Sequence, residues 1–229
     1  MDLVWERPEP PERAAPVPLS RAHIVETACA LADSGGLEAV SLRKVAAALG
    51  AGPMRLYGYL GTKEELLDLM VDAVYAEIPL PDPATGWRPA LRALAHACRA
   101  AAQRHEWFAD LLGGRPSLGP HALAYLEASL AAAADLAELN DAMIAVFTVH
   151  AYVAGAVRSE IVERRLARET GLDEEAWQRA SGPYLERMFA TGHYPALARS
   201  VRDADHLDPD TIFDAGLDRI FTGLATVTA

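Results

Sequence analysis

Apolar residues recur every three or four positions along most of the chain, which is the spacing of one face of an α-helix. The first such segment follows Ser20, a favourable N-cap residue, and would turn Ile24, Ala28 and Leu31 inward. It ends at the glycine pair 35–36, where a helix readily stops. The pattern therefore predicts one complete helix over residues 20–36.

Three more helices are expected before the prolines at positions 79, 81 and 83 interrupt the chain. Each has a start signal: Ser41 and Thr62 are N-cap residues, the second in a capping box, and Pro53 suits a first helical turn. Leu56 and Leu60, four positions apart, would face the core from the third helix. The expected ranges are 41–50, 53–61 and 62–78.

The remainder of the chain is helical in pattern and nowhere shows the sustained alternation of a β-strand. One helix carries Leu91, Leu94, Cys98 and Ala102, about twenty helical residues follow Pro120, and a long helix runs from Asn140 to about Thr170. A helical region over 173–204 is expected to break near 182–183 and 192–195. Asp208 and Pro209 begin the last helix.

These segments predict an all-α protein in three parts. Residues 1–18 contain five prolines and are expected to form a flexible arm. Residues 19–65 have the layout of a three-helix helix-turn-helix DNA-binding domain, and residues 66–229 form a helical body.

Charge divides along nearly the same boundaries. The formal net charge of −11 argues against binding a polyanion over the whole surface. Residues 20–63, however, carry five basic and three acidic side chains and include both lysines, Lys44 and Lys63. Residues 64–229 carry fourteen basic and twenty-five acidic side chains. Contact with DNA is therefore expected only in the smaller segment.

Several classes of protein are not indicated. The first eighteen residues show no signal peptide, and the longest apolar stretch, 142–157, is shorter than a membrane span. Cys29 and Cys98 lie in helical patterns and suit a reducing compartment. Motifs of metalloproteases, nucleotide-binding loops, serine hydrolases and thiol oxidoreductases are missing. We expect a cytoplasmic protein that is no enzyme, has no membrane partner and needs no cofactor or metal.

The helix from Pro53 is the candidate DNA-recognition helix. With Leu56 and Leu60 inward, Arg55 can point at guanine or phosphate, and Met54 at a thymine methyl group. The N-termini of the helices starting at Ser41 and Thr62 suit phosphates. Solvated side chains on a small bundle would give the same pattern. The expected DNA contacts are Ser41, Arg43, Lys44, Pro53, Met54, Arg55, Tyr57, Tyr59 and Lys63.

The stretch SLRKVAAALGAGPMRLYGYLGTKEELLDLMVDAV resembles the operator-binding domain of the TetR family of repressors. Trp87-Arg88, the turn at 113–116 and the closing IFDAGLDRIFTGL resemble its tetracycline-repressor branch, so the likeness covers nearly the whole chain. It implies a ligand-responsive, bacterial repressor whose body, 66–229, binds a small molecule and dimerises. Gly58 departs from the pattern because many relatives carry a larger, DNA-reaching residue there.

The resemblance also directs attention to an effector site. Tetracycline repressors hold a drug–magnesium chelate with a His before the turn at 113–116 and a Thr within it, whereas this chain has Leu111, Leu112, Gly113 and Gly114 there. We therefore expect a largely apolar effector and no metal. His105 can equally be explained by a favourable position at a helix C-terminus. The expected lining is Leu94, Cys98, His105, Trp107, Leu111, Tyr125 and Ser129.

A two-fold dimer would let two readers share a palindromic operator. The helix around 142–157 and the last helix are expected to build a four-helix interface that contains Gly155, Phe213, Gly216, Leu217, Ile220 and Leu224. Effector binding would then swing the helix over 62–78 and move the readers out of register. Two alternatives are a small-molecule carrier or adaptor with a vestigial reader, and a helical enzyme, which would need a converging acid–base pair.

Overall fold

The computed structural model describes residues 3–10, 19–114, 116–134, 136, 138–205 and 207–227. These residues form helices and connections, with no strand among them, so the predicted all-α class is confirmed. Two short 3₁₀ helices, η1 (Leu37–Ala39) and η2 (Pro83–Thr85), join longer elements. The α-helices are α1 (Arg21–Gly35), α2 (Leu42–Ala48), α3 (Pro53–Leu56), α4 (Lys63–Ala76), α5 (Trp87–Arg104), α6 (Phe108–Leu111), α7 (Pro120–Ala133), α8 (Leu139–Thr170), α9 (Glu174–Ala190), α10 (Pro195–Asp203) and α11 (Pro209–Val227).

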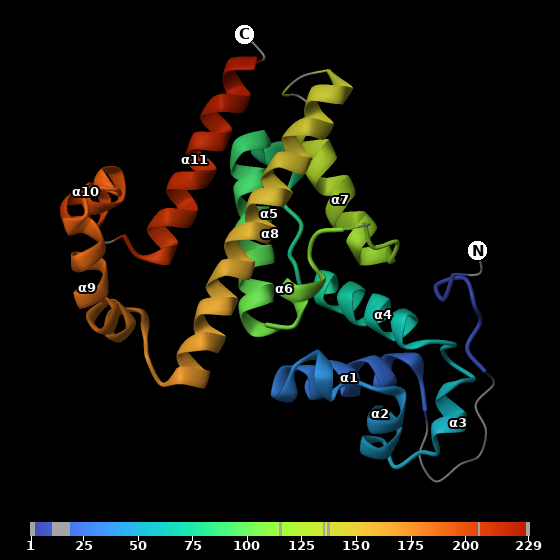
Figure 1. Ribbon diagram of the computed structural model, residues 1–229. Helices are drawn as coiled ribbons and strands as arrows, with labels where there is room; N and C mark the ends of the chain where they lie inside the picture. Colours follow the sequence, from blue (N-terminus) through green and yellow to red (C-terminus); the bar gives the residue numbers. More distant parts are fainter. Residues whose placement is uncertain are drawn as a thin grey trace.

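Helices α1, α2 and α3 form a small domain at one end of the molecule (Figure 1). Its helices begin at the predicted caps: the hydroxyl oxygens of Ser20 and Ser41 accept hydrogen bonds from the backbone N–H groups three residues later. Leu56 and Leu60 are fully buried in its core, as their spacing predicted. We call this domain, residues 19–61, the reader.

Helix α4 leaves the reader and enters the body. Thr62 accepts a hydrogen bond from the N–H of Glu65, and the carboxylate of Glu65 accepts one from the N–H of Gly61 at 2.7 Å. This reciprocal arrangement is close to the predicted capping box. α4 packs against α1 on one side and α7 on the other, so it is the main element shared by reader and body.

The body consists of α5 to α8 together with α11 (Figure 1). α8 lies across α5, α7 and α11 and turns Val149, Val153 and Val157 into the core. Gly216 allows α11 to lie close to α8, since a Cβ atom there would fall 2.0 Å from the Tyr152 hydroxyl oxygen. α8 is also long and apolar enough to cross a membrane by length and composition, with 33% of its most apolar window buried inside the protein.

The hairpin of α9 and α10 extends away from the body (Figure 1). α9 has no buried side chain among the described residues, and α10 buries Ala198 alone. The sequence predicted a break near Gly182–Pro183, but α9 continues through Pro183. The predicted break at 192–195 is present, and α7 is shorter than expected.

Residues 3–10 lie against the folded domains. Val4 is 3% exposed, and Trp5 packs on the main hydrophobic core. A turn is closed by the N–H of Glu6, which donates to the carbonyl oxygen of Leu3. This contact was not expected for a flexible arm. The remainder of that arm, residues 11–18, lies outside the described residues, so its flexibility stays a prediction.

Candidate functional site: a DNA-reading surface and an effector cavity

The outer surface of α3 presents several side chains predicted to meet DNA. Met54 is 79% exposed and Tyr57 is 51% exposed, while Arg55 is half-buried on the same helix. Arg43 and Lys63 are exposed at the starts of α2 and α4. One short helix thus offers apolar, cationic and hydroxyl groups, which are the groups that read base edges and phosphates.

Three other expected contacts have structural partners. Tyr59 is only 7% exposed, and its hydroxyl donates a 2.6 Å hydrogen bond to the carbonyl oxygen of Leu19. We therefore leave Tyr59 out of the proposed DNA contacts. The Ser41 hydroxyl caps α2, and the Lys44 ammonium donates to the carbonyl oxygen of Glu38 at 2.9 Å. Pro53, in contrast, is exposed at the start of α3.

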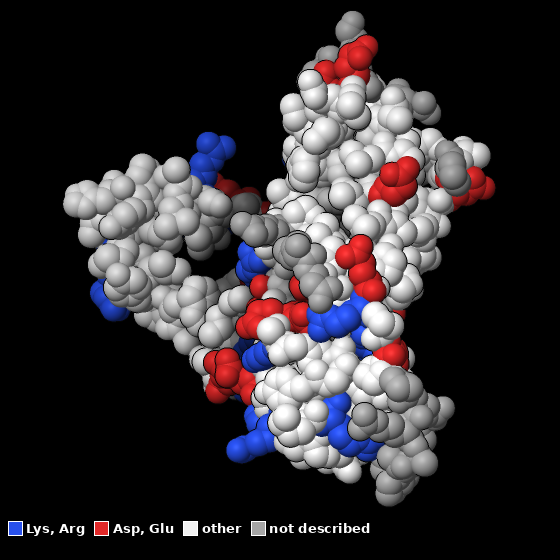
Figure 2. All heavy atoms as spheres, turned by 90° about the vertical axis from the view of Figure 1, so that its right-hand side faces the viewer, with Lys and Arg blue, Asp and Glu red and all other residues white. Residues whose placement is uncertain are grey.

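The charges on the visible face in Figure 2 follow the division expected from the sequence in part, since Lys and Arg side chains also lie at mid-height and on the lobe at the left. Lys and Arg side chains are visible at the lower end of the molecule, which the reader forms, and Asp and Glu side chains extend up the body. Because an acidic body repels phosphates, DNA contact is favourable mainly at the reader.

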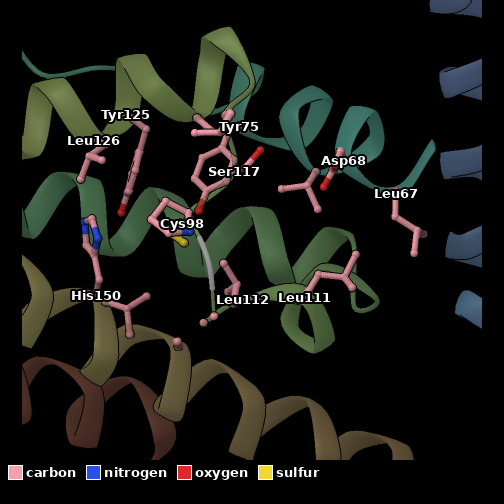
Figure 3. A pocket seen from close by; sticks show the side chains of 18 of the residues that line it. Leu67, Asp68, Tyr75, Cys98, Leu111, Leu112, Ser117, Tyr125, Leu126 and His150 are labelled. Carbon is pink, nitrogen blue, oxygen red and sulfur yellow. The ribbon is translucent and has the colours of Figure 1, made fainter. Parts of the chain in front are cut away.

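A cavity of about 590 Å³ lies in the body between α4, α5, α7 and α8 (Figure 3). Tyr125 and His150 reach toward one another from α7 and α8 and stack, with ring centroids 5.2 Å apart and planes inclined by 28°. Cys98 on α5 lies beside them, and Tyr75 approaches from α4. The volume and the mainly apolar, aromatic lining are those of a site for a small organic molecule.

Three of the seven expected lining residues, Cys98, Leu111 and Tyr125, do line this cavity. Leu94 and Ser129 are instead buried residues outside the lining, and the Ser129 hydroxyl donates to the carbonyl oxygen of Tyr125 at 2.9 Å. A helical repeat shows which residues face inward, but it does not show which of them border an empty space.

His105 and Trp107 do not line the cavity and connect the reader to the body. Both contact one carboxylate oxygen of Asp33 on α1, at 2.8 Å from the His105 Nδ1 and 2.7 Å from the Trp107 Nε1. The other His105 nitrogen lies 3.0 Å from Glu77, just beyond α4. His105 does stand at the C-cap of α5, and these contacts with two carboxylates give it a structural role outside the cavity.

Several residues of the cavity wall are not among those expected from the sequence. Tyr75, Asp68 and Val71 come from the inner face of α4, and Phe147 and His150 from α8. The sequence predicts the helix over 62–78, but a helical repeat does not show which of its residues border an empty space. Leu3 and Trp5 also line the cavity, and no periodic signal indicates them because they precede the first helix.

Four polar side chains of the cavity, those of Cys98, Tyr75, Tyr125 and His150, are neutral near pH 7. Burial raises the pKa of the Cys98 thiol to about 12 and also raises the pKa of Tyr75 and of Tyr125 above the ordinary tyrosine value. Burial lowers the pKa of His150 to about 4, and its Nε2 lies 3.2 Å from the Ser129 hydroxyl. Among the described lining residues, Asp68 is the only charged side chain.

The described residues do not fit a metal chelate. No group of three or more His, Cys, Asp or Glu side chains converges in the part of the chain that the structure describes. In the cavity, His150 is stacked on Tyr125, and Asp68 lies on the opposite wall. We therefore derive no step through a metal ion.

The predicted dimer residues have two different environments. Phe213 and Leu217 are at most 1% exposed within the single chain, where Phe213 stacks on Tyr152 at a centroid distance of 5.7 Å. Their assignment to the interface is thus corrected: they are core residues of the protomer, and Gly216 serves the same internal packing. Gly155 is exposed, and Ile220 and Leu224 are half-buried.

Comparison with known proteins places this arrangement among characterised regulators. Residues 24–70 match the family model for bacterial regulatory proteins of the tetR family, and residues 80–228 match the tetracyclin repressor-like C-terminal domain. The transcriptional repressor DrrR1 of Streptomyces coeruleorubidus is 38% identical over 100% of this chain and 86% of its own length.

Two further matches agree. A transcriptional regulator of Saccharopolyspora erythraea is 36% identical over 97% of this chain and 91% of its own length. The crystal structure of ActR from Streptomyces coelicolor in complex with actinorhodin superposes with a TM-score of 0.79 and 27% identity, covering 94% of this chain and 98% of that chain.

Proposed function

The chain belongs to the TetR family of helix-turn-helix transcriptional regulators, and from this premise we propose that it represses transcription from a palindromic operator as a homodimer. A small, largely apolar molecule releases it from DNA. One observation carries the proposal: α4 begins at Lys63, directly after the reader, and supplies Leu67, Asp68, Val71 and Tyr75 to the wall of the cavity.

The lining supports an effector that is aromatic and uncharged or cationic. Tyr75, Tyr125, Phe147 and His150 offer ring faces, which favour stacking. The described lining residues include no Lys or Arg, so an anionic group would have no counter-charge there. The complexes of ActR with actinorhodin and with (S)-DNPA support a small-molecule effector in general.

Helix α4 is the proposed lever. Its inner face meets the cavity, its N-terminal cap is continuous with the reader, and Asp72 anchors its middle to the start of α7. An effector that fits one position of α4 better than another shifts the population of reader positions by that difference in affinity. Because two readers must fit two half-sites together, a small displacement lowers operator affinity.

The proposed homodimer is supported by apolar surfaces that are exposed in the single chain. Ile144, Ala151, Gly155, Val162 and Leu166 are exposed along α8 at intervals of four or seven residues, which places them on one face. Such a face of apolar and small residues suits close packing against the same face of a second copy. The α9–α10 hairpin, with Trp177 and Tyr184 exposed among others, adds more apolar surface.

Selection of DNA from a random pool with the full-length protein tests the proposal. We expect the enriched sequences to share an inverted repeat that binds two protomers. Nile red, an uncharged fluorescent dye, should lower operator affinity at saturation, as measured by fluorescence anisotropy. Failure to enrich any repeat between 50 and 200 mM salt, a range over which phosphate contacts weaken by about 10³ or more, would contradict it.

The same experiment separates the alternatives. A carrier or adaptor with a vestigial reader would bind Nile red and enrich no DNA. Gly58 gave rise to that alternative because it offers no side chain to a base. In the structure its position is constrained, since a Cβ atom there would lie 3.3 Å from the carbonyl oxygen of Arg55 and 3.4 Å from the Cγ of Pro10. The close approach of these atoms explains the glycine at position 58 without requiring any loss of DNA binding.

A further inference from the structure

The N-terminal segment, residues 3–10, touches the cavity at one end. Leu3 and Trp5 are part of the cavity wall, and Val4 between them is 3% exposed. Trp5 also borders a second, open groove that lies between α1 and the α4–α7 side of the body. The indole therefore separates the effector cavity from the surface of the reader, and it is fixed there by a buried neighbour.

The same segment is attached to the first turn of α4. A guanidinium nitrogen of Arg7 lies 2.5 Å from a carboxylate oxygen of Glu65, and this contact lowers the pKa of Glu65 below its ordinary value. The other carboxylate oxygen of Glu65 accepts the hydrogen bond from the N–H of Gly61. Arg7 thus holds the residue that joins the reader to the lever.

Attachment to the reader is also direct. The Arg21 guanidinium donates to the carbonyl oxygens of Arg7, at 3.0 Å, and Tyr59, at 3.4 Å. The backbone N–H of Arg21 donates to a carboxylate oxygen of Glu9 at 3.3 Å. Pro10 lies beside Gly58, directly after the DNA-reading helix α3.

We propose that residues 3–10 complete the wall of the effector cavity, through Leu3 and Trp5, and transmit its occupancy to the reader. This inference rests on the proposed function and adds a route that does not pass along α4. An aromatic effector in the cavity packs against Trp5 and draws the segment toward itself. Because only one residue separates Trp5 from Arg7, the movement loosens the Arg7 and Arg21 contacts that hold the ends of α3 and α4.

Two variants at one position test the role of the ring. Trp5→Ala removes the wall, and we expect its affinity for Nile red to fall about tenfold, as for a well-packed aromatic anchor. Trp5→Phe keeps an aromatic face and should retain most of the affinity. Thermal unfolding of both variants shows that they are folded.

Hydrogen exchange in the wild-type protein tests transmission without any substitution. Saturating Nile red should slow exchange in residues 3–10 and speed it in residues 57–66. In Trp5→Ala, even at saturating dye, exchange in residues 57–66 should no longer become faster. The operator affinities of this variant with and without the dye should become nearly equal. Trp5→Phe should retain both responses.

The outcomes separate this inference from the proposed function. If the dye releases the operator while residues 3–10 exchange as before and Trp5→Ala responds like wild type, the inference is wrong and the repressor function stands. If no operator is found, the exchange data still decide whether occupancy reaches residues 57–66. A wild-type protein that takes up no dye also overturns the inference.

Discussion

Two tyrosines that are two positions apart in the reader have opposite environments. Tyr57 is half-exposed, and its ring points away from the core, whereas the Tyr59 hydroxyl is bonded inside the domain to Leu19. The sequence assigned both to DNA, because residues of the same type at neighbouring turn positions cannot be separated by periodicity alone. Burial decides between them.

This contrast predicts that substitution of Tyr59 lowers stability, whereas substitution of Tyr57 lowers operator affinity. Tyr59→Phe leaves the carbonyl oxygen of Leu19 without its donor and should lower the free energy of unfolding by about 1 kcal/mol. Tyr57→Ala should leave that free energy nearly unchanged and weaken binding to the selected operator about tenfold, the equivalent of about 1.4 kcal/mol. Denaturant unfolding and anisotropy titrations measure the two effects. Equal operator affinity of Tyr57→Ala and wild type would contradict the proposed docking of α3.

His150 predicts a pH dependence of stability. Its pKa is about 4 in the folded chain against 6.5 in the absence of burial, so between these values the unfolded state binds the proton more readily. Stability is therefore highest above pH 6.5 and falls as the pH drops toward 4. From pH 6.5 to 5 the loss is about 2 kcal/mol.

The matched variant His150→Gln should flatten this part of the profile, with unfolding measured at pH 7.5, 6 and 5. The nearby Cys98, Tyr75 and Tyr125 have raised pKa values and do not titrate in this range. The lowered pKa values of Glu65 and Glu77 place their effects at lower pH. Parallel profiles for the variant and wild type would show that His150 is not the titrating group.

At the scale of elements, α4 and α7 are joined by one buried carboxylate. Asp72 is 4% exposed, and one of its oxygens accepts hydrogen bonds from the N–H groups of His121 and Ala122, each at 2.9 Å. A residue on α4 thus provides the N-terminal cap of α7. Gly119 is required beside it, because a Cβ atom there would lie 2.2 Å from the carboxylate oxygen.

We therefore expect Gly119→Ala to displace Asp72 and lower the free energy of unfolding by about 2 kcal/mol or more, the cost of a lost cap and an unsatisfied buried carboxylate. Gly182→Ala is the control, since nothing lies within 4 Å of a Cβ atom at this helical position. It should stabilise α9 slightly because alanine favours helices. Thermal unfolding distinguishes the two, and equal shifts in both variants would refute the role of Gly119.

The elements were predictable from sequence to the extent that local chemistry determines them. Ser20, Ser41 and Thr62 cap the predicted helices because short-range hydrogen bonds decide helix starts. The break predicted at Pro183 is wrong, because a proline inside a helix lowers its stability without always ending it. The cavity was only partly predictable, since its wall includes Trp5, which no helical repeat could place beside α4 and α8.

The same limit applies to the interface. Phe213 and Leu217 form an apolar stripe whether they face their own core or a second copy, and only their burial in the single chain separates the two cases. The face of α8 that contains Gly155 is bare in the single chain. The sequence pattern thus shows which helix faces are apolar, and the three-dimensional structure shows which of them pack inside the protomer and which remain exposed.

For the whole molecule we expect a dimer of the 24.6 kDa chain. Gly155→Arg places a long cation on the bare face of α8 and should produce a folded monomer with much weaker operator binding. Ala131→Arg adds the same charge at an exposed position of α7, outside that face, and should remain dimeric. Sedimentation at micromolar concentration measures both. A wild-type monomer, or a dimeric Gly155→Arg, would contradict this interface.

The α9–α10 hairpin adds a dependence on dilution. A helix that buries none of its own described side chains gains little from the fold of one protomer, because most helical stability in proteins comes from packing. If a second protomer supplies that packing, the local opening free energy of the hairpin becomes a function of protein concentration, while that of α5 does not. At the low copy number typical of a repressor, the hairpin would then fray before the body does, and abundance itself would set how much of the chain is ordered.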